Sequence, residues 1–162
     1  MTIPFVSNDK QEVIQYVPKW HGIENPFGDI WNCVDGVIIN SSSIVENNKK
    51  YNEVYATDDT SFYSDSNYSN MKLVGIEPNE SGYIKEFDLG NTAEIIPRLN
   101  GGSTIQYKCD YHWINLSSGL RILIIGGDAT NTNSAGLCGY RSALGINDDN
   151  KYMGFRSSCI LP

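Results

Sequence analysis

The chain has 162 residues, the length of one typical domain, and is long enough to bury a hydrophobic core. Apolar residues make up 40% of it and charged residues 19%, a balance that excludes an intrinsically disordered chain. The net charge of −7 disfavours a nucleic-acid partner, because binding to phosphates requires clustered lysine and arginine.

Short apolar clusters, broken by Gly, Asn, Asp and Ser, predict a β-rich and loop-rich domain. The alternating residues 12–17 predict an early strand that Pro18 ends, since proline cannot donate to a strand ladder. Residues 29–39 predict one strand or two shorter ones, with a turn or bulge at Asp35 and Gly36. Residues 40–70 are polar and predict a surface excursion around a weak strand at 51–56.

The second half of the chain predicts further strands. Two short ones are expected at 71–76 and 82–89, joined by a turn. Residues 104–114 and 120–127 predict the strongest pair, joined by a hairpin at 115–119, and the second of them is aliphatic enough to be buried on both faces. The first thirty residues and residues 92–98 are the two places where a short helix is conceivable.

The sequence shows no signal for export or for membrane insertion. No apolar run approaches the ~20 residues that span a bilayer. The opening residues, MTIPFVSNDKQEV, lack the basic and apolar regions of a signal peptide. We therefore expect no membrane insertion and no export through a signal sequence.

The four cysteines lie far apart and form no CxxC pair, which argues against a zinc site or a redox centre. The favoured interpretation is isolated thiols, because a domain of this size does not need disulfides to be stable. Two disulfides remain an arithmetical alternative. The cysteines are Cys33, Cys109, Cys138 and Cys159.

Two stretches resemble the formylglycine-generating-enzyme (sulfatase-modifying factor) superfamily. Residues 22–37, GIENPFGDIWNCVDGV, are similar to its GNVWEWVDG signature. The superfamily's last block has a GG start, an Arg-containing middle and a terminal GFR, and residues 125–159 match this pattern. The matching residues are Gly126, Gly127, Arg141, Gly154, Phe155 and Arg156.

The last block is more similar still to a group of phage structural proteins. In that group GG is followed by a polar loop, AGL, a second polar loop and GFR or GGR, and here residues 135–137 are in the AGL place. The YKCDYHW stretch at 107–113 adds to this likeness. Because the blocks occur in the correct order and together cover about two thirds of the chain, the resemblance is fairly specific.

The resemblance implies one α+β domain over residues 1–162, β-rich and loop-rich, with a C-type-lectin-like fold. Residues 1–20 would form an N-terminal strand or extension that joins the domain to a larger virion protein. Glycines that permit close backbone approach or positive φ, and a C-terminal arginine that binds neighbouring acceptors, would hold the loops in place. The expected structural anchors are Trp31, Gly126, Gly127, Gly154, Phe155 and Arg156.

The polar loops 128–134 and 145–151 lie between these anchors, and the resemblance places them on one exposed face. Their amides, hydroxyls and carboxylates, with nearby aromatic rings, suit contact with a sugar or a protein. Loops that are merely solvated remain the alternative. The candidate binding residues are Trp113, Asp128, Thr130, Asn131, Asn133, Tyr140, Asn147, Asp148 and Tyr152.

Catalytic and metal sites have weak support in the sequence. The superfamily's enzymes bind copper with a pair of cysteines, whereas this chain has a lone Cys138 in the comparable region, and one sulfur cannot hold Cu(I). Cys109 with His112 is a conceivable nucleophile pair, but we expect His112 to be a partly exposed ring on an aromatic strand. The Glu-Pro-Asn sequence at 77–79 is interpreted as a turn, because it supplies too few ligands for calcium. We expect no cofactor and no metal.

Together these features predict a non-enzymatic surface protein of a phage virion, at a tail tip, tail fibre or head fibre, that binds a bacterial cell-surface glycan or protein. Such a protein is made in the cytoplasm of the bacterial host and needs no export segment. Two alternatives remain. One is a structural decoration or assembly module whose loops trimerise the domain or cap another virion protein, and the other is a cysteine-oxidising enzyme of the formylglycine-generating type.

Overall fold

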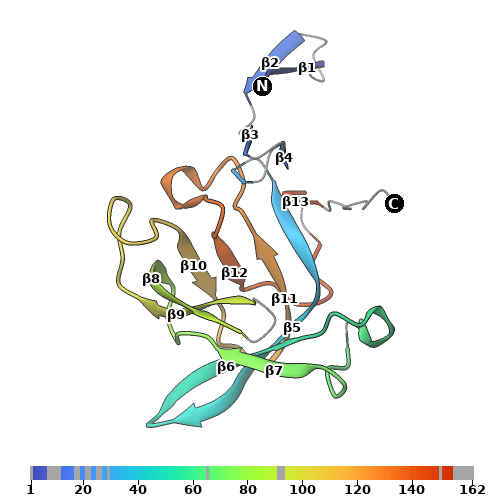
Figure 1. Cartoon of the computed structure of the whole chain (residues 1–162), viewed down its shortest axis with the longest axis vertical. Coiled ribbons are helices and arrows are strands. Elements are labelled where there is room, and N and C mark those ends of the chain that lie inside the picture. The colour runs from blue at the N-terminus through green and yellow to red at the C-terminus, as the bar shows by residue number, and fades with distance from the viewer. Residues whose placement is uncertain are drawn as a thin grey trace.

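The structure is a computed structural model that describes residues 27–28, 30–64, 66–90, 94–149 and 151–154. Before these it describes the backbone of four short strands. Strand β1 (Thr2–Val6) pairs with β2 (Glu12–Tyr16), and β3 (Lys19–Trp20) pairs with β4 (Ile23–Glu24). Both hairpins are separate from the large sheet that all later strands form (Figure 1). The early strand expected at 12–17 is thereby confirmed.

The large sheet has nine strands in the order β7-β6-β5-β11-β12-β10-β8-β9, with β13 paired to β5. Two single-turn 3₁₀ segments, η1 (Thr60–Phe62) and η2 (Thr132–Ser134), are the only helical elements in the described part of the chain. The β-rich expectation is confirmed, whereas the α-helical component of an α+β fold is not seen there. The strands are β5 (Trp31–Glu46), β6 (Lys49–Ala56), β7 (Lys72–Ile76), β8 (Gly82–Leu89), β9 (Ile95–Asn100), β10 (Tyr111–Ile114), β11 (Gly119–Ile125), β12 (Tyr140–Ser142) and β13 (Met153–Gly154).

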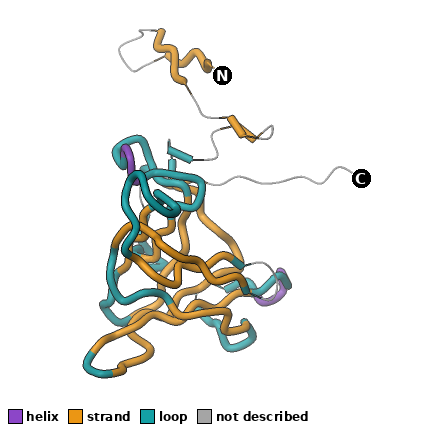
Figure 2. The backbone as a smooth tube through the Cα atoms, turned by 60° about the vertical axis from the view of Figure 1, so that its left-hand side comes forward, coloured by secondary structure: helices purple, strands orange, loops and turns teal. Residues whose placement is uncertain are grey.

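The sheet curls until its two ends, β7 and β9, come into contact (Figure 2). A Cβ added to Gly75 of β7 would lie 2.7 Å from Cδ1 of Ile96 on β9, so glycine permits this approach. The curled sheet therefore has an inner face, which encloses a core, and an outer face, on which the long loops lie. The core cluster consists of Ile39, Val54, Ile84, Ile96, Leu123 and Tyr140.

Strand β5 is a single strand of 16 residues, and its predicted irregularity at Asp35 and Gly36 is a bulge. Gly36 has φ of +74°. The pairing with β11 shifts there, since Ile122 faces Ile38 and Ile124 faces Cys33. Four residues of β5, 34–37, thus lie opposite the single residue Leu123 of β11, which confirms a bulge rather than a chain reversal.

The expectation of a surface excursion over residues 40–70 is wrong for residues 40–46, whereas the weak strand expected at 51–56 is confirmed as part of β6. Strand β5 continues to Glu46 and forms a hairpin with β6. Its polar residues misled the sequence analysis, because Ser41 and Asn52 are buried and hydrogen-bond each other across the hairpin at 2.9 Å. The second half, 57–70, is a loop that contains η1.

Two expected connections also differ. Residues 95–98, in the stretch 92–98 where a helix was conceivable, begin β9 (Ile95–Asn100) instead. Strands β10 and β11 do not form a hairpin, because β12 lies between them. Arg141 of β12 pairs with Ile124 on one side and with Trp113 on the other. Segment 115–119 is therefore a crossing connection, and the three-residue β12 is too short to have been detected from its pattern.

No helix in the described residues is long and apolar enough to cross a membrane.

Candidate functional site

Trp31, the first residue of β5, holds together the loops on one part of the outer face. Its indole is buried, and Nε1 donates a hydrogen bond to the Asp128 carboxylate at 2.8 Å, across 97 residues of sequence. The Trp113 ring contacts it edge-on at 5.1 Å between centroids, and the Arg141 guanidinium lies 5.6 Å from its ring centre. Trp31 therefore occupies the position of a structural anchor.

Segment 126–139 is a closed loop that begins and ends at glycines. The amide of Gly126 donates to the carbonyl of Gly139 at 2.9 Å, and the amide of Gly136 donates back to Gly126 at 3.1 Å. Gly126 and Gly127 have φ of +99° and +86°. A Cβ at Gly127 would lie 2.7 Å from that of Ala135, so both the dihedral and the space at this position require glycine.

Asp128 was expected on the exposed face, and the structure corrects this, since only 4% of the residue is exposed. Its carboxylate accepts hydrogen bonds from Trp31 and from the amide and hydroxyl of Thr130. Its own amide donates to Oδ1 of Asn131 at 2.7 Å. The hydrogen bonds to this buried carboxylate hold the loop in one conformation. Only atoms on the outer surface of the loop can therefore contact a partner.

Tyr140 was also expected on the exposed face and is instead 3% exposed, inside the core cluster. It lies in the central strand β12, where it pairs with Ile125 and His112, and the strand alternation turns it inward. Burial raises the pKa of its hydroxyl well above the usual range, and the nearby Glu77 carboxylate adds to this. Tyr140 is therefore unable to contact an external partner.

A second loop, residues 145–152, reaches the same anchor. The Trp31 amide donates to the Tyr152 carbonyl at 2.8 Å, and β13 then pairs with the start of β5. Asp148 closes a turn by accepting from the Gly145 amide at 2.7 Å, while its residue remains exposed. Gly154 lies close against Ile30, and a Cβ there would require the Ile30 side chain to move. Phe155 and Arg156, expected as further anchors, lie outside the described residues.

We call the surface of these two loops the loop face. Both loops meet at Trp31, one through the Asp128 side chain and the other through the Tyr152 backbone. Asn131 is half-buried within it, and a hollow of about 240 Å³ opens between the first loop and Phe27. The exposed side chains of the loop face are Ala129, Thr130, Thr132, Asn133, Leu137, Asn147, Asp148, Asp149, Lys151 and Tyr152.

Half-buried aromatic side chains continue from Trp31 along the outer face. Trp113 packs on Tyr111 at 4.7 Å between centroids, and Tyr111 packs on Tyr83 at 4.9 Å. Of these, only Trp113 was a sequence candidate. Tyr111 and Tyr83 were missed because their contact depends on the pairing of β10 with β8, although the alternation of Tyr111 and Trp113 in YHW was a visible signal.

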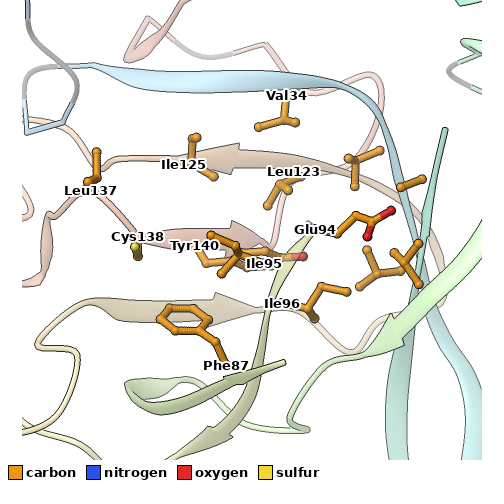
Figure 3. A pocket seen from close by; sticks show the side chains of 14 residues that line it. Val34, Phe87, Glu94, Ile95, Ile96, Leu123, Ile125, Leu137, Cys138 and Tyr140 are labelled. Atoms are coloured by element: carbon orange, nitrogen blue, oxygen red, sulfur yellow. The ribbon is translucent and has the colours of Figure 1, made fainter. Parts of the chain in front are cut away.

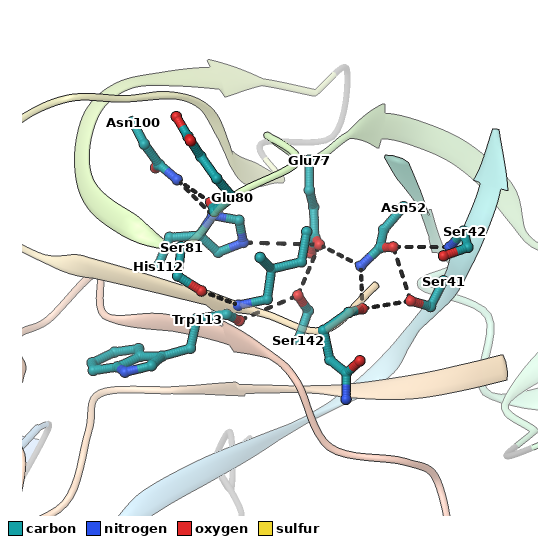
Figure 4. A network of polar contacts seen from close by, with 12 residues as sticks. Ser41, Ser42, Asn52, Glu77, Glu80, Ser81, Asn100, His112, Trp113 and Ser142 are labelled. Carbon is teal, nitrogen blue, oxygen red and sulfur yellow. Dashed lines mark hydrogen bonds and ion pairs between the residues drawn. The ribbon is translucent and has the colours of Figure 1, made fainter. Parts of the chain in front are cut away.

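The polar residues that were considered for chemistry form a buried network inside the sheet instead (Figure 4). His112 is fully buried, which overturns the expectation of a partly exposed ring. Its Nε2 lies 3.8 Å from the carboxylate of Glu77, the first residue of the expected Glu-Pro-Asn turn. That carboxylate accepts from Ser142 Oγ at 2.8 Å and from Asn52 Nδ2 at 3.2 Å.

His112 does not lie beside a thiol. Its Nδ1 is 3.3 Å from the Asn100 amide nitrogen, while Cys109 Sγ approaches the carbonyl of Tyr107 at 3.9 Å. Burial, with the nearby Asp110 carboxylate, raises the pKa of the Cys138 thiol, which disfavours the reactive thiolate. The Glu77 network therefore resembles a set of buried structural hydrogen bonds and not a catalytic dyad open to substrate.

The cysteines of the described residues, Cys33, Cys109 and Cys138, are free. Cys159 lies outside that part of the chain. Within the same residues no three or more His, Cys, Asp or Glu side chains gather closely enough to hold a metal ion. The side chains of the loop face are exposed and those of the aromatic row beside it are half-buried, so both are accessible to another molecule.

No known protein family, curated protein or solved structure matches the chain.

Proposed function

We propose that this chain is a non-enzymatic adhesion domain on the surface of a phage virion, at a tail tip, tail fibre or head fibre, and that its loop face binds a bacterial cell-surface glycan or protein. The observation that carries this proposal is the convergence of two polar loops on one buried tryptophan. Synthesis in the bacterial cytoplasm followed by assembly on the virion surface is part of the proposal.

The two blocks that resemble phage structural proteins are far apart in sequence but adjoin in space. The first block contains Trp31, and the second contains Asp128 and β13, which contact Trp31 and its strand. A shared packing arrangement of this kind is a physical reason for both blocks to occur together. This contact supports the finer assignment to a C-type-lectin-like, formylglycine-generating-enzyme-like fold.

The composition of the loop face suits a neutral, hydroxyl-rich partner. Thr130, Asn133 and Asn147 offer hydroxyl and amide groups that both donate and accept hydrogen bonds. The loop is held by backbone and buried carboxylate contacts, so binding would order few additional groups. Trp113 lies close to this anchor and adds flat apolar surface on which a sugar ring can pack.

The test is binding of the fluorescently labelled domain to bacterial cells of the host. The double variant Thr132→Ala with Asn133→Ala is expected to lower labelling at least tenfold, because it removes two exposed polar side chains of the loop face. Its unfolding free energy is expected to stay within about 0.5 kcal/mol of the wild type. The matched control, Thr104→Ala with Asn70→Ala, changes the same residue types at exposed positions elsewhere and should label cells normally.

Equal labelling by the loop variant and the control would contradict the proposal.

The alternative function, an assembly module, is favoured by exposed apolar side chains at Ile105 and Leu89. It predicts a stable oligomer, a homotrimer in the simplest case, whose mass falls to that of the monomer when Ile105 or Leu89 is replaced by Ser. Light scattering during size-exclusion chromatography measures this directly.

A further inference from the structure

A cavity of about 330 Å³ lies inside the curled sheet (Figure 3). Side chains from six strands, β5, β6, β7, β8, β9 and β11, form its walls together with Tyr140 of β12. Val54, Leu123 and Ile96 belong both to these walls and to the core cluster. The cavity is thus a hollow part of the core itself and not a groove between surface loops.

The cavity wall is almost entirely hydrocarbon. Tyr140 lines the cavity, and burial keeps its hydroxyl neutral by raising its pKa well above the usual range. Cys138 contributes a thiol that burial keeps protonated by raising its pKa. The remaining polar side chain is Glu94, which Figure 3 shows extending among the apolar wall residues.

The cavity opens to solvent at one edge. Ile95 and Leu137 both line it, yet they are 50% and 41% exposed. Ile95 pairs with Leu89, which is more exposed still, so the rim is aliphatic. An apolar hollow of this kind holds water poorly, because water needs polar partners there, and it is a favourable site for an apolar molecule.

We propose that this cavity is a binding site for a small amphiphile whose apolar body fills the hollow and whose neutral or cationic head lies at the rim beside Glu94. At the ~30 Å³ that a water-sized group takes in a liquid, the volume accommodates on the order of ten non-hydrogen atoms. The Glu94 carboxylate and the net charge of −7 oppose an anionic head. Leu137 and Cys138 of the first loop also line this cavity, but the proposal does not rest on the function proposed for the loop face.

Three probes with the same chain length test the proposal: n-octylamine, n-octanol and n-octanoate. Titration calorimetry on the wild-type chain is expected to show binding of the amine and the alcohol. The amine should bind about tenfold more tightly than the carboxylate, because one head is attracted to Glu94 and the other repelled. Glu94→Gln should reduce this ratio to near one and leave octanol binding unchanged.

The cavity itself is tested by filling it. Val74→Phe adds an aromatic ring at the wall and is expected to reduce octanol affinity at least tenfold. Val45→Phe adds the same ring at an exposed position of β5 and should bind octanol as the wild type does. If Val74→Phe does not fold, methyl NMR of the wild type tests whether octanol enters the cavity. Octanol in the cavity must shift the methyl signals of Leu123 and Ile125, which line it.

Three results would overturn the proposal: no binding of any probe up to its solubility limit, equal octanol affinity in folded Val74→Phe and wild type, or octanol-induced shifts that spare Leu123 and Ile125. Sedimentation of the chain with phosphatidylcholine vesicles in the absence of octylamine binding would also overturn it, because the occupant would then be a bilayer lipid. None of these outcomes affects the cell-labelling test of the loop face.

Discussion

The two ends of the sheet interior are built from the same strands in opposite ways. At one end, hydrogen bonds join Ser41, Asn52, Glu77 and Ser142, with His112 Nε2 3.8 Å from the Glu77 carboxylate, and we call this the polar end. At the other, which we call the apolar end, the walls are hydrocarbon and a cavity remains. Strands β5, β6 and β12 run from one to the other, and β6, for example, has Asn52 in the first and Val54 and Ala56 in the second.

This difference shows that directional hydrogen bonds fix the geometry of one part of the core, whereas apolar contacts leave unfilled volume in the other. In the polar end each donor needs an acceptor at a set distance and angle, so the network fixes how β6, β12 and the residue after β7 lie relative to one another. Apolar contacts do not depend on direction in this way. The sheet can therefore close while a cavity remains at its apolar end. The polar end is therefore a structural element, and the apolar end has room for a ligand.

The largest expected effect is at the centre of the polar end. Glu77→Ala removes the acceptor for Asn52 and Ser142 and should lower the free energy of unfolding by about 4 kcal/mol. Urea denaturation followed by tryptophan fluorescence measures it. Glu80→Ala, three residues away and exposed, is the matched control and should change stability by less than about 0.5 kcal/mol. A loss below about 1 kcal/mol for Glu77→Ala would mean that the network is not structural.

A smaller effect is expected from placing a polar group in the apolar end. Val54→Thr preserves the side-chain shape but buries a hydroxyl among hydrocarbon walls, which should cost about 2 kcal/mol. The same exchange at exposed Val45 should cost almost nothing. If Val54→Thr proved as stable as the wild type, water or another polar partner would have to reach the apolar end, and the comparison would fail.

The smallest effect concerns a carboxylate at the margin of the apolar end. Burial raises the pKa of Asp110, which accepts a hydrogen bond from the Cys138 amide. The folded state thus favours the protonated carboxyl, so this group's contribution to stability is present at low pH and is lost as pH rises through its folded pKa. Asp110→Asn should therefore raise the free energy of unfolding at pH 7 by a few tenths of a kcal/mol relative to the wild type. The effect is small because solvent screens the half-exposed group.

At pH 3 this gain should vanish, because the wild-type carboxyl is then protonated as well. Urea midpoints of both proteins at the two pH values give the comparison. An Asp110→Asn gain that is equal at pH 3 and pH 7 would show that ionisation of Asp110 does not contribute.

Much of the sheet could be predicted from the sequence. Alternation and β-branched runs predicted strands where β5, β6, β7, β8 and β11 lie, and Gly36 predicted the bulge in β5. Strands β12 and β13 are too short to show a period. The pairing of β12 with both β10 and β11 also explains why the expected hairpin between β10 and β11 does not form.

The interior was harder to predict, because polarity alone does not show which way a side chain points. Ser41 and Asn52 indicated surface by composition, yet each is buried with a partner from another strand. Asp128 and Tyr140 were expected to be exposed for the same reason, in loops or beside them. The contact between Trp31 and Asp128 joins residues 97 positions apart, and no local pattern reveals it.

The central claim, that one end of the interior is hollow and apolar while the other is filled by a polar network, is tested most directly by xenon, which occupies dry apolar cavities. Methyl NMR spectra of the wild-type chain recorded under xenon pressure should show saturable shifts for Val54, Leu123 and Ile125, which line the cavity. Ile114, next to the polar end on β10, should not shift. Spectra in which the three cavity methyl groups do not respond would contradict the account.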